Sequence, residues 1–273
     1  MKSLWLGSAA LVAIIAASSA GAADLSQPVY KAPPSVVPPV YNWTGFYLGV
    51  NAGGAWGTSD ITGTLSSLPA PANDTAYEAA ESPNLRPDGF TGGAQAGFNW
   101  QSGNVVFGLE ADFGYFGLNG SQTTNIVPSG PVTLTATVNN SLKTDWLFTA
   151  RPRIGWANNN WLVYATGGLA MTDMKFNSSF SDTAGETEAA TFDKTKAGWT
   201  AGGGVEVAFA GNWSAKLEYL YADFGSVSVT DPVLLAGVPE SLSTTHDVSL
   251  HTQIVRAGLN YRFDWGAPVV SRY

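Results

Sequence analysis

The chain has 273 residues, with 13 Lys and Arg against 21 Asp and Glu, a formal net charge of −8. Only 12% of the residues are charged, which is roughly half the usual share for a soluble globular chain. The acidic balance argues against a nucleic-acid partner, because that partner requires a basic face. The absence of cysteine excludes disulfides, a thiolate nucleophile and a cysteine-ligated metal.

Residues 1–23 read as a secretory signal peptide. Lys2 supplies the positive start, residues 4–17 form an apolar run, and small residues at 20–22 fit a cleavage site after Ala22 or Ala23. A membrane anchor is the alternative, but the run is shorter than the ~20 residues that a spanning helix needs.

Residues 24–42 are rich in proline. Proline cannot donate to a β-ladder and favours the extended polyproline II conformation, so the segment is predicted to be a semi-rigid periplasmic tether. The prolines are Pro28, Pro33, Pro34, Pro38 and Pro39.

Residues 43–263 contain eight segments in which apolar and polar side chains alternate. They are residues 43–56, 89–101, 105–118, 145–156, 161–176, 196–209, 213–224 and 250–263. Each is long enough to cross a bilayer as a tilted strand, which takes ~9–11 residues. The sequence therefore predicts an all-β fold, an eight-stranded antiparallel up-and-down transmembrane β-barrel, followed by a C-terminal extension at 264–273.

The third segment shows the alternation clearly. Leu109, Phe113 and their odd-numbered neighbours share one face, while Glu110 and Asp112 lie on the other. The fourth segment is interrupted by Pro152, and proline within a strand usually marks a bulge or an edge. A bulge there would shift the register, so that Arg151 and Arg153 need not share a face.

The connections alternate in length. Tight turns at 102–104, 157–160 and 210–212 are separated by long polar links at 57–88, 119–144, 177–195 and 225–249. This asymmetry is typical of outer-membrane barrels, whose long loops lie outside the cell. Residues 132–138 alternate as well, which predicts that some strands continue beyond the bilayer.

The alternative is a soluble barrel of the lipocalin type, in which the apolar face would point inside. The positions of the tryptophans distinguish this alternative from a membrane barrel. Tryptophans cluster near segment ends, as in the aromatic girdles at the two membrane interfaces. The predicted girdle consists of Trp43, Trp56, Trp100, Trp146, Trp156, Trp161, Trp199, Trp213 and Trp265. The glycine-rich polar face would then point inward and leave room for long charged side chains.

The charges on this inward face are close to balance. They are Glu110, Asp112, Arg151, Arg153, Glu206, Lys216, Glu218, Arg256 and Arg262. The interior of an eight-stranded barrel is just wide enough for side chains to fill, and buried charges must be paired. We therefore predict a lumen plugged by a salt-bridge network; the alternative is that the same charges line a narrow porin for small solutes.

The long links are acidic. These links carry Asp60, Glu81, Glu188, Asp231 and similar residues. They would make an acidic exterior that holds divalent cations bridging lipopolysaccharide, or that attracts cationic partners, including an extracellular ligand. The alternative is a solvated, variable loop surface.

Catalysis and cofactor binding have little support in the sequence. The two histidines, His246 and His251, lie near the start of the eighth segment without a further ligand motif. The sequence predicts no cofactor, no metal and no enzymatic activity.

Several stretches are similar to one known family. WTGFYLGVNAGGAWG, FGLEADFGYF, RPRIGWA, YATGGLA, GWTAGGGVEVAFAGNWSAKLEYLYADFG and VRAGLNYRF resemble the small outer-membrane β-barrel family of alpha-proteobacteria, the OmpA-like or opacity-type porins. The resemblance implies eight strands in the outer membrane of a Gram-negative cell, a surface or envelope-stabilising role, and no catalytic residues. It also implies recognition by the barrel-assembly machinery through a last strand ending in an aromatic residue, which Tyr261 and Phe263 match.

Overall fold

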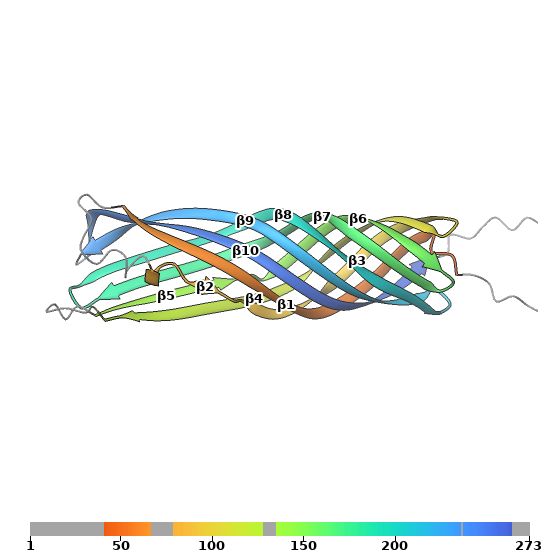
Figure 1. Ribbon diagram of the computed structural model, residues 1–273, viewed down its shortest axis with the longest axis horizontal. Helices are drawn as coiled ribbons and strands as arrows, with labels where there is room; N and C mark the ends of the chain where they lie inside the picture. The colour runs from red at the N-terminus through yellow and green to blue at the C-terminus, as the bar shows by residue number, and fades with distance from the viewer. Residues whose placement is uncertain (1–40, 67–78, 128–134, 236, 264–273) are drawn as a thin grey trace, which may run out of the picture. The chain divides into compact units, whose positions relative to one another are not determined.

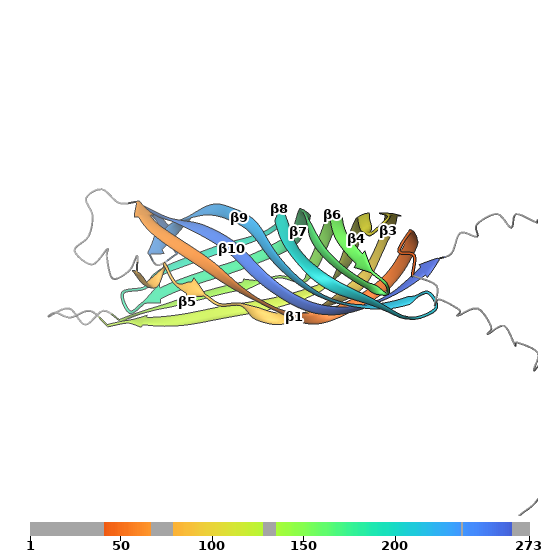
Figure 2. The same ribbon diagram turned by 45° about the vertical axis from the view of Figure 1, so that its right-hand side comes forward.

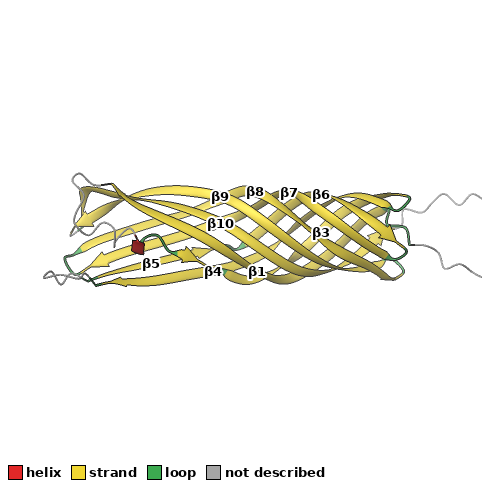
Figure 3. Cartoon of the chain, viewed as in Figure 1, coloured by secondary structure: helices red, strands yellow, loops and turns green. Residues whose placement is uncertain are grey.

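The computed structural model describes residues 41–66, 79–127, 135–235 and 237–263 (Figure 1). The predicted signal peptide at 1–23, the C-terminal extension at 264–273 and residues 24–40 of the predicted tether lie outside the described residues. The described chain is almost entirely β-strand (Figure 3). Within these ranges, no helix has both the length and the apolar character needed to cross a membrane.

Ten strands are present in the described part of the chain. They are β1 (Gly45–Ser66), β2 (Asn84–Leu85), β3 (Asp88–Ser102), β4 (Val105–Ile126), β5 (Ala136–Lys143), β6 (Trp146–Asn158), β7 (Trp161–Asp182), β8 (Glu186–Ala210), β9 (Trp213–Leu235) and β10 (Val238–Phe263). All pairings between them are antiparallel, and β10 pairs with β1 to close the sheet on itself.

The ten strands form a ring of eight. The short β2 continues β3, because Ser59 pairs with Leu85 in the same register that pairs Trp56 with Asp88. Likewise β5 continues β6, and both lie between β4 and β7. The register with β4 shifts by one residue between them, at a β-bulge around Thr144. The predicted eight-stranded antiparallel barrel is confirmed.

The strands extend well past the predicted segments. Tight turns join neighbouring strands at one end, which we call the short-turn end; beyond the predicted segments the strands run on to the opposite, long-strand end (Figures 1 and 2). The links predicted as polar loops at 119–144, 177–195 and 225–249 are therefore largely strand. The reason is that β4, β7, β9 and their neighbours keep their ladder hydrogen bonds beyond the apolar belt.

The two faces of the wall differ as the alternation predicts. On β4, Leu109 is 66% exposed and Phe113 is 59% exposed, whereas Glu110 and Asp112 are buried inside. Apolar side chains on the outer surface and carboxylates within are the reverse of a soluble barrel.

Pro152 does not shift the pairing of β6 with β7. Pairing of β6 with β7 follows one register on both sides of this residue, from Ala150 opposite Leu169 to Arg153 opposite Thr166. Pro152 points outward, and its carbonyl accepts a hydrogen bond from the Thr166 hydroxyl at 2.9 Å. Arg151 and Arg153 consequently share the inner face.

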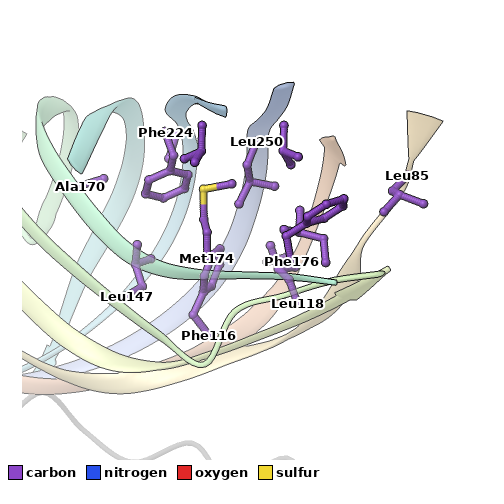
Figure 4. Packing of buried hydrophobic residues seen from close by; sticks show 14 of the residues in the cluster. Leu85, Phe116, Leu118, Leu147, Ala170, Met174, Phe176, Phe224 and Leu250 are labelled. Carbon is purple, nitrogen blue, oxygen red and sulfur yellow. The ribbon is translucent and has the colours of Figure 1, made fainter. Parts of the chain in front are cut away.

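Apolar side chains also fill part of the interior. Toward the long-strand end, Phe116, Met174, Phe176, Phe224 and Leu250 belong to one buried cluster (Figure 4). A smaller cluster that contains Trp43, Val106 and Leu162 occupies the short-turn end. The charged residues of the inner face lie along the strands between these two apolar layers.

Candidate functional site

Eight of the nine charges predicted for the lumen come together in its centre. Four are acids and four are bases, so their formal charges cancel. Each is at most 5% exposed: Glu110, Asp112, Arg151, Arg153, Glu206, Lys216, Glu218 and Arg256. They are contributed by β4, β6, β8, β9 and β10, which lie on different sides of the ring.

Arg256 on β10 connects two walls of the barrel. Its Nη1 and Nη2 lie 2.9 and 3.0 Å from the two carboxylate oxygens of Asp112 on β4, a bidentate pair. Its Nε and Nη2 lie 2.8 and 2.7 Å from Glu218 Oε2 on the neighbouring β9. Charge-assisted bidentate pairs of this kind are the strongest of the ordinary hydrogen bonds.

Arg151 and Lys216 make the crossing in the other direction. Arg151 on β6 places Nη2 2.9 Å from both Glu110 Oε1 and Asp112 Oδ2, and Nη1 3.3 Å from Glu218 Oε1. Lys216 Nζ on β9 lies 2.8 Å from Glu110 Oε1 on β4. Since β4 and β9 occupy opposite positions in the ring of eight, these contacts span the full lumen.

Arg153 occupies the layer nearer the short-turn end. Its Nη1 lies 3.1 Å from Glu206 Oε2, and its guanidinium carbon lies 4.8 and 5.1 Å from the ring centroids of Tyr47 and Tyr164. The two tyrosines donate hydrogen bonds into the same network, Tyr47 to Glu110 at 2.7 Å and Tyr164 to Glu218 at 2.9 Å. A guanidinium between two aromatic faces gains cation–π attraction where water is excluded.

Uncharged polar side chains complete the network, and the sequence analysis did not assign them a role. Asn99 accepts a hydrogen bond from Arg153 Nε at 2.9 Å, and Asn260 donates one to Glu206 at 2.7 Å. Thr149 donates to Asp112 at 2.5 Å, and Ser214 donates to Glu206 at 2.6 Å. All four lie on the inner face, so the alternation of side chains along each strand is the sequence feature that could have identified them.

Arg262, the ninth predicted charge, lies in a different layer of the barrel from these eight. It is half-buried near the short-turn end, where its Nε lies 3.2 Å from the Tyr41 hydroxyl and its Nη2 lies 3.3 Å from Asn212 Oδ1. The reason is position: Arg262 is six residues beyond Arg256 on β10, more than one layer away from the central charges.

Trp43 also departs from the prediction. It is only 2% exposed and packs inside the barrel with Val106, Leu162 and Tyr164. The centroids of the Trp43 and Tyr41 rings are 4.8 Å apart. Trp43 precedes β1, so the alternation of that strand does not decide which way its side chain points.

The other described tryptophans of the predicted girdle lie on the outside. Trp146 is half-exposed, and Trp265 lies outside the described residues. The remaining tryptophans are each at least 42% exposed: Trp56, Trp100, Trp156, Trp161, Trp199 and Trp213. Tyr261 and Phe263, the predicted assembly signal, are 36% and 39% exposed and pair with Leu48 and Phe46 at the seam of β10 and β1. Their role in assembly stays a prediction.

A second buried polar group lies toward the long-strand end, and the sequence analysis missed it. Glu81, Glu188 and His246, which had been assigned to exposed links, are each at most 5% exposed. The prediction that these residues lie on the exterior is wrong, because the strands continue past the apolar belt and enclose them. Burial raises the pKa of the Glu81 carboxyl to about 7, an effect that His246 opposes and Glu188 reinforces.

Within the described ranges, no group of three or more His, Asp or Glu side chains is arranged to hold a metal ion. The central charges are committed to one another, and their carboxylates accept hydrogen bonds from Arg, Lys, Tyr, Thr, Ser and Asn donors. The arrangement is suited to filling and stiffening a lumen.

A closed ring of eight antiparallel strands, apolar outside and charged within, defines the class of transmembrane β-barrels. The chain belongs to the outer membrane protein beta-barrel domain family, whose model matches residues 8–263. A 31 kDa outer-membrane immunogenic protein of Brucella melitensis is 38% identical over 265 residues, which cover 96% of this chain and 100% of the relative. The protein is therefore located in the outer membrane, as predicted.

Two further proteins to which the chain is similar are also outer-membrane proteins. A 22 kDa outer membrane protein of Rhizobium leguminosarum is 32% identical over 190 residues, covering 70% of this chain and 68% of the relative. The solved structure of the outer membrane protease OmpT from Escherichia coli has 8% identity and a TM-score of 0.47, covering 82% of this chain and 99% of that one. The structural likeness has no bearing on function.

Proposed function

We propose that this protein is a sealed, structural and surface-exposed barrel of the outer membrane, without catalytic activity. The observation that carries the proposal is the central network of four acids and four bases, which crosses the lumen between β4 and β9. An eight-stranded barrel leaves little interior beyond its side chains, so a network of this extent blocks solute passage.

The apolar layers support the same reading. Phe116, Met174 and Phe224 lie on one side of the charges, and Trp43 and Leu162 on the other, each at most 2% exposed. A pore for polar solutes needs a continuous hydrated path, whereas these layers interrupt it twice.

The relatives suggest the surface role. The Brucella proteins are named outer-membrane immunogenic proteins, and we extend an antigen or adhesion-type role to this chain on that basis. In this proposal the long-strand end faces the exterior, where it contacts lipopolysaccharide and presents a site for an extracellular ligand, and the chain is inserted by the barrel-assembly machinery.

Conductance of the refolded protein in planar bilayers tests the proposal. We expect no stable single-channel openings, and we expect Glu110→Ala and Arg256→Ala to lower stability instead of altering a conductance. A narrow porin, the competing function, would give stable openings whose conductance changes with these two substitutions. Heat-modifiable migration on a gel establishes in the same samples that a closed barrel has formed.

A further inference from the structure

The backbone ladder of the barrel wall is interrupted between β8 and β9, just beyond the apolar belt. The two strands pair as far as Trp199 opposite Asp223, and pairing resumes only at Thr187 opposite Leu234. Gly225 lies where the strands separate, and its φ of 66° takes β9 out of the regular extended conformation. Residues 188–198 of β8 and 224–233 of β9 therefore border an interruption in the ladder.

Two lysines lie at this interruption. Lys194 is opposite Met174 of β7, whose side chain is buried inside the barrel, yet Lys194 is exposed. Lys196 is half-buried, and its Nζ donates a hydrogen bond across the interruption to the carbonyl oxygen of Ser226 on β9 at 2.8 Å. Two lysine side chains that belong to the inner face of β8 thus reach the surface, because the ladder is missing here.

On the membrane side of the lysines, three rings form a row across β8, β9 and β10. The ring centroids of Trp199 and Tyr221 are 5.4 Å apart, and the nearly parallel rings of Tyr221 and His251 have centroids 6.5 Å apart. His251 Nδ1 lies 3.3 Å from the Tyr221 hydroxyl and 3.4 Å from Asp223 Oδ1. The row therefore combines flat apolar faces with hydrogen-bonding groups at their edges.

Below this row begins the belt that meets lipid, where Leu217 of β9 and Val255 of β10 are exposed. From the membrane toward the long-strand end, this side of the barrel presents apolar side chains, then aromatic rings with polar edges, then two lysines. The same order of chemistry is found in a membrane glycolipid, which has acyl chains, sugar rings and phosphate groups.

We propose that this side of β8 and β9 binds a phosphorylated glycolipid of the lipopolysaccharide type, with Lys194 and Lys196 on a phosphate and Trp199 and Tyr221 against the sugar rings. An ammonium group is a compact point charge that suits phosphate, and aromatic rings at a membrane interface lie at the level of the head groups. The site deepens the proposed contact with lipopolysaccharide and rests on the proposed outward orientation of the long-strand end.

The nearby acids do not occupy the lysines. Asp223 faces His251, and Asp193 lies on the outer face of β8, opposite Lys175 of β7. Within the described part of the chain, neither Lys194 nor Lys196 forms an ion pair, and Lys194 has no side-chain hydrogen bond. Both ammonium groups are therefore available to an anion.

Native mass spectrometry of the full-length protein in detergent tests the phosphate contact, with bisphosphorylated lipid A as the probe. Lys194→Met combined with Lys196→Met removes both charges, and we expect the affinity to fall by about tenfold or more. Lipid A without its phosphates should bind the parent and this variant equally. Arg86→Met combined with Lys143→Met is the matched control, because it removes two exposed charges elsewhere on the wall; it should change the affinity by less than about twofold.

Equal losses for the two double variants would reveal a general attraction to basic side chains and overturn the site. Displacement of lipid A from the parent by excess inorganic phosphate would show that the lysines bind free phosphate, and would overturn the glycolipid assignment. Both faces of the barrel are accessible in detergent, so failure to bind is distinct from a wrong orientation, which labelling of intact cells reports.

Trp199→Leu tests the contact with the sugar. It keeps an apolar side chain at the head-group level without the ring, and we expect lipid A with or without phosphates to bind about fivefold more weakly. Trp56→Leu, at an exposed tryptophan of β1, is the control and should leave binding unchanged. Unchanged binding by Trp199→Leu would contradict the sugar contact. If a variant fails to form a heat-modifiable barrel, the parent decides: equal affinity for the two forms of lipid A overturns the proposal.

Discussion

At the scale of single residues, the lumen depends on charges that satisfy one another. Each central guanidinium or ammonium contacts at least one carboxylate within 3.1 Å. Taking an ion out of water costs several kcal/mol, so a buried pair is only modestly favourable as a whole, yet the removal of one partner leaves an uncompensated charge. Single substitutions in this network should therefore be severe.

Arg256→Met measures this cost. It removes the cation that binds both Asp112 and Glu218, and we expect a loss of about 3–5 kcal/mol in the free energy of unfolding, measured by urea titration of the protein refolded into lipid vesicles. Arg262→Met is the comparison, because Arg262 is the same residue type on the same strand and donates hydrogen bonds to the neutral Tyr41, Thr44 and Asn212. We expect a smaller loss there, since Asp112 and Glu218 keep Arg256 as their partner. Equal losses for the two variants would contradict the assignment of Arg256 to a coupled network.

At the scale of elements, one strand serves two environments. On β7 the apolar side chains Val163 and Leu169 point outward, but farther along the strand Met174, Phe176 and Phe180 point inward. The outer face meets lipid in the first part and water in the second, so the apolar face changes sides within one continuous ladder. The predicted segment on this strand, residues 161–176, runs only a few residues past this change.

Glycine on the inner face makes room for the two tyrosines of the network. A Cβ on Gly97 of β3 would lie 2.7 Å from the Leu109 carbonyl oxygen and would overlap the Tyr47 ring. Gly97→Ala should therefore lower the free energy of unfolding by about 1–3 kcal/mol through overpacking, in the same urea assay. Gly54→Ala is the control, since no atom lies within 4 Å of its added Cβ, and it should be neutral or slightly stabilising. Equal effects of the two substitutions on the free energy of unfolding would contradict the close packing of Gly97 against Tyr47.

At the scale of the whole molecule, the asymmetry of the two ends predicts orientation. Short turns close one end, while the long-strand end carries the extended hairpins (Figure 1). Long connections outside the cell are typical of outer-membrane barrels, because only short turns are used on the periplasmic side.

Cysteine labelling of intact cells checks this orientation. A membrane-impermeant maleimide should modify Thr123→Cys on β4 and should leave Asn158→Cys, beside a short turn, unmodified until the outer membrane is opened. Both positions are exposed in the folded chain, so burial does not separate them. The reverse labelling pattern would mean that the barrel is inserted the other way round.

The amino-acid sequence was enough to predict the class of protein, the number of strands, and which side chains face lipid and which face the lumen within the membrane. This was possible because successive side chains of a membrane strand face lipid and the lumen in turn, so that apolar and polar residues alternate, as Leu109 and Glu110 do. It also identified all eight central charges, because the alternation along each strand shows which side chains face inward, and buried acids and bases must be present in equal number.

The folded barrel was needed to show which charges contact one another and which side chains point inward beyond the membrane. The contact between Arg256 and Asp112 depends on the stagger of β10 and β4, which are far apart in sequence. The burial of Trp43, Glu81 and His246 depends on how the barrel closes above and below the lipid. There, water surrounds the wall and the alternation no longer reports a membrane, so the interior is set by contacts across the ring.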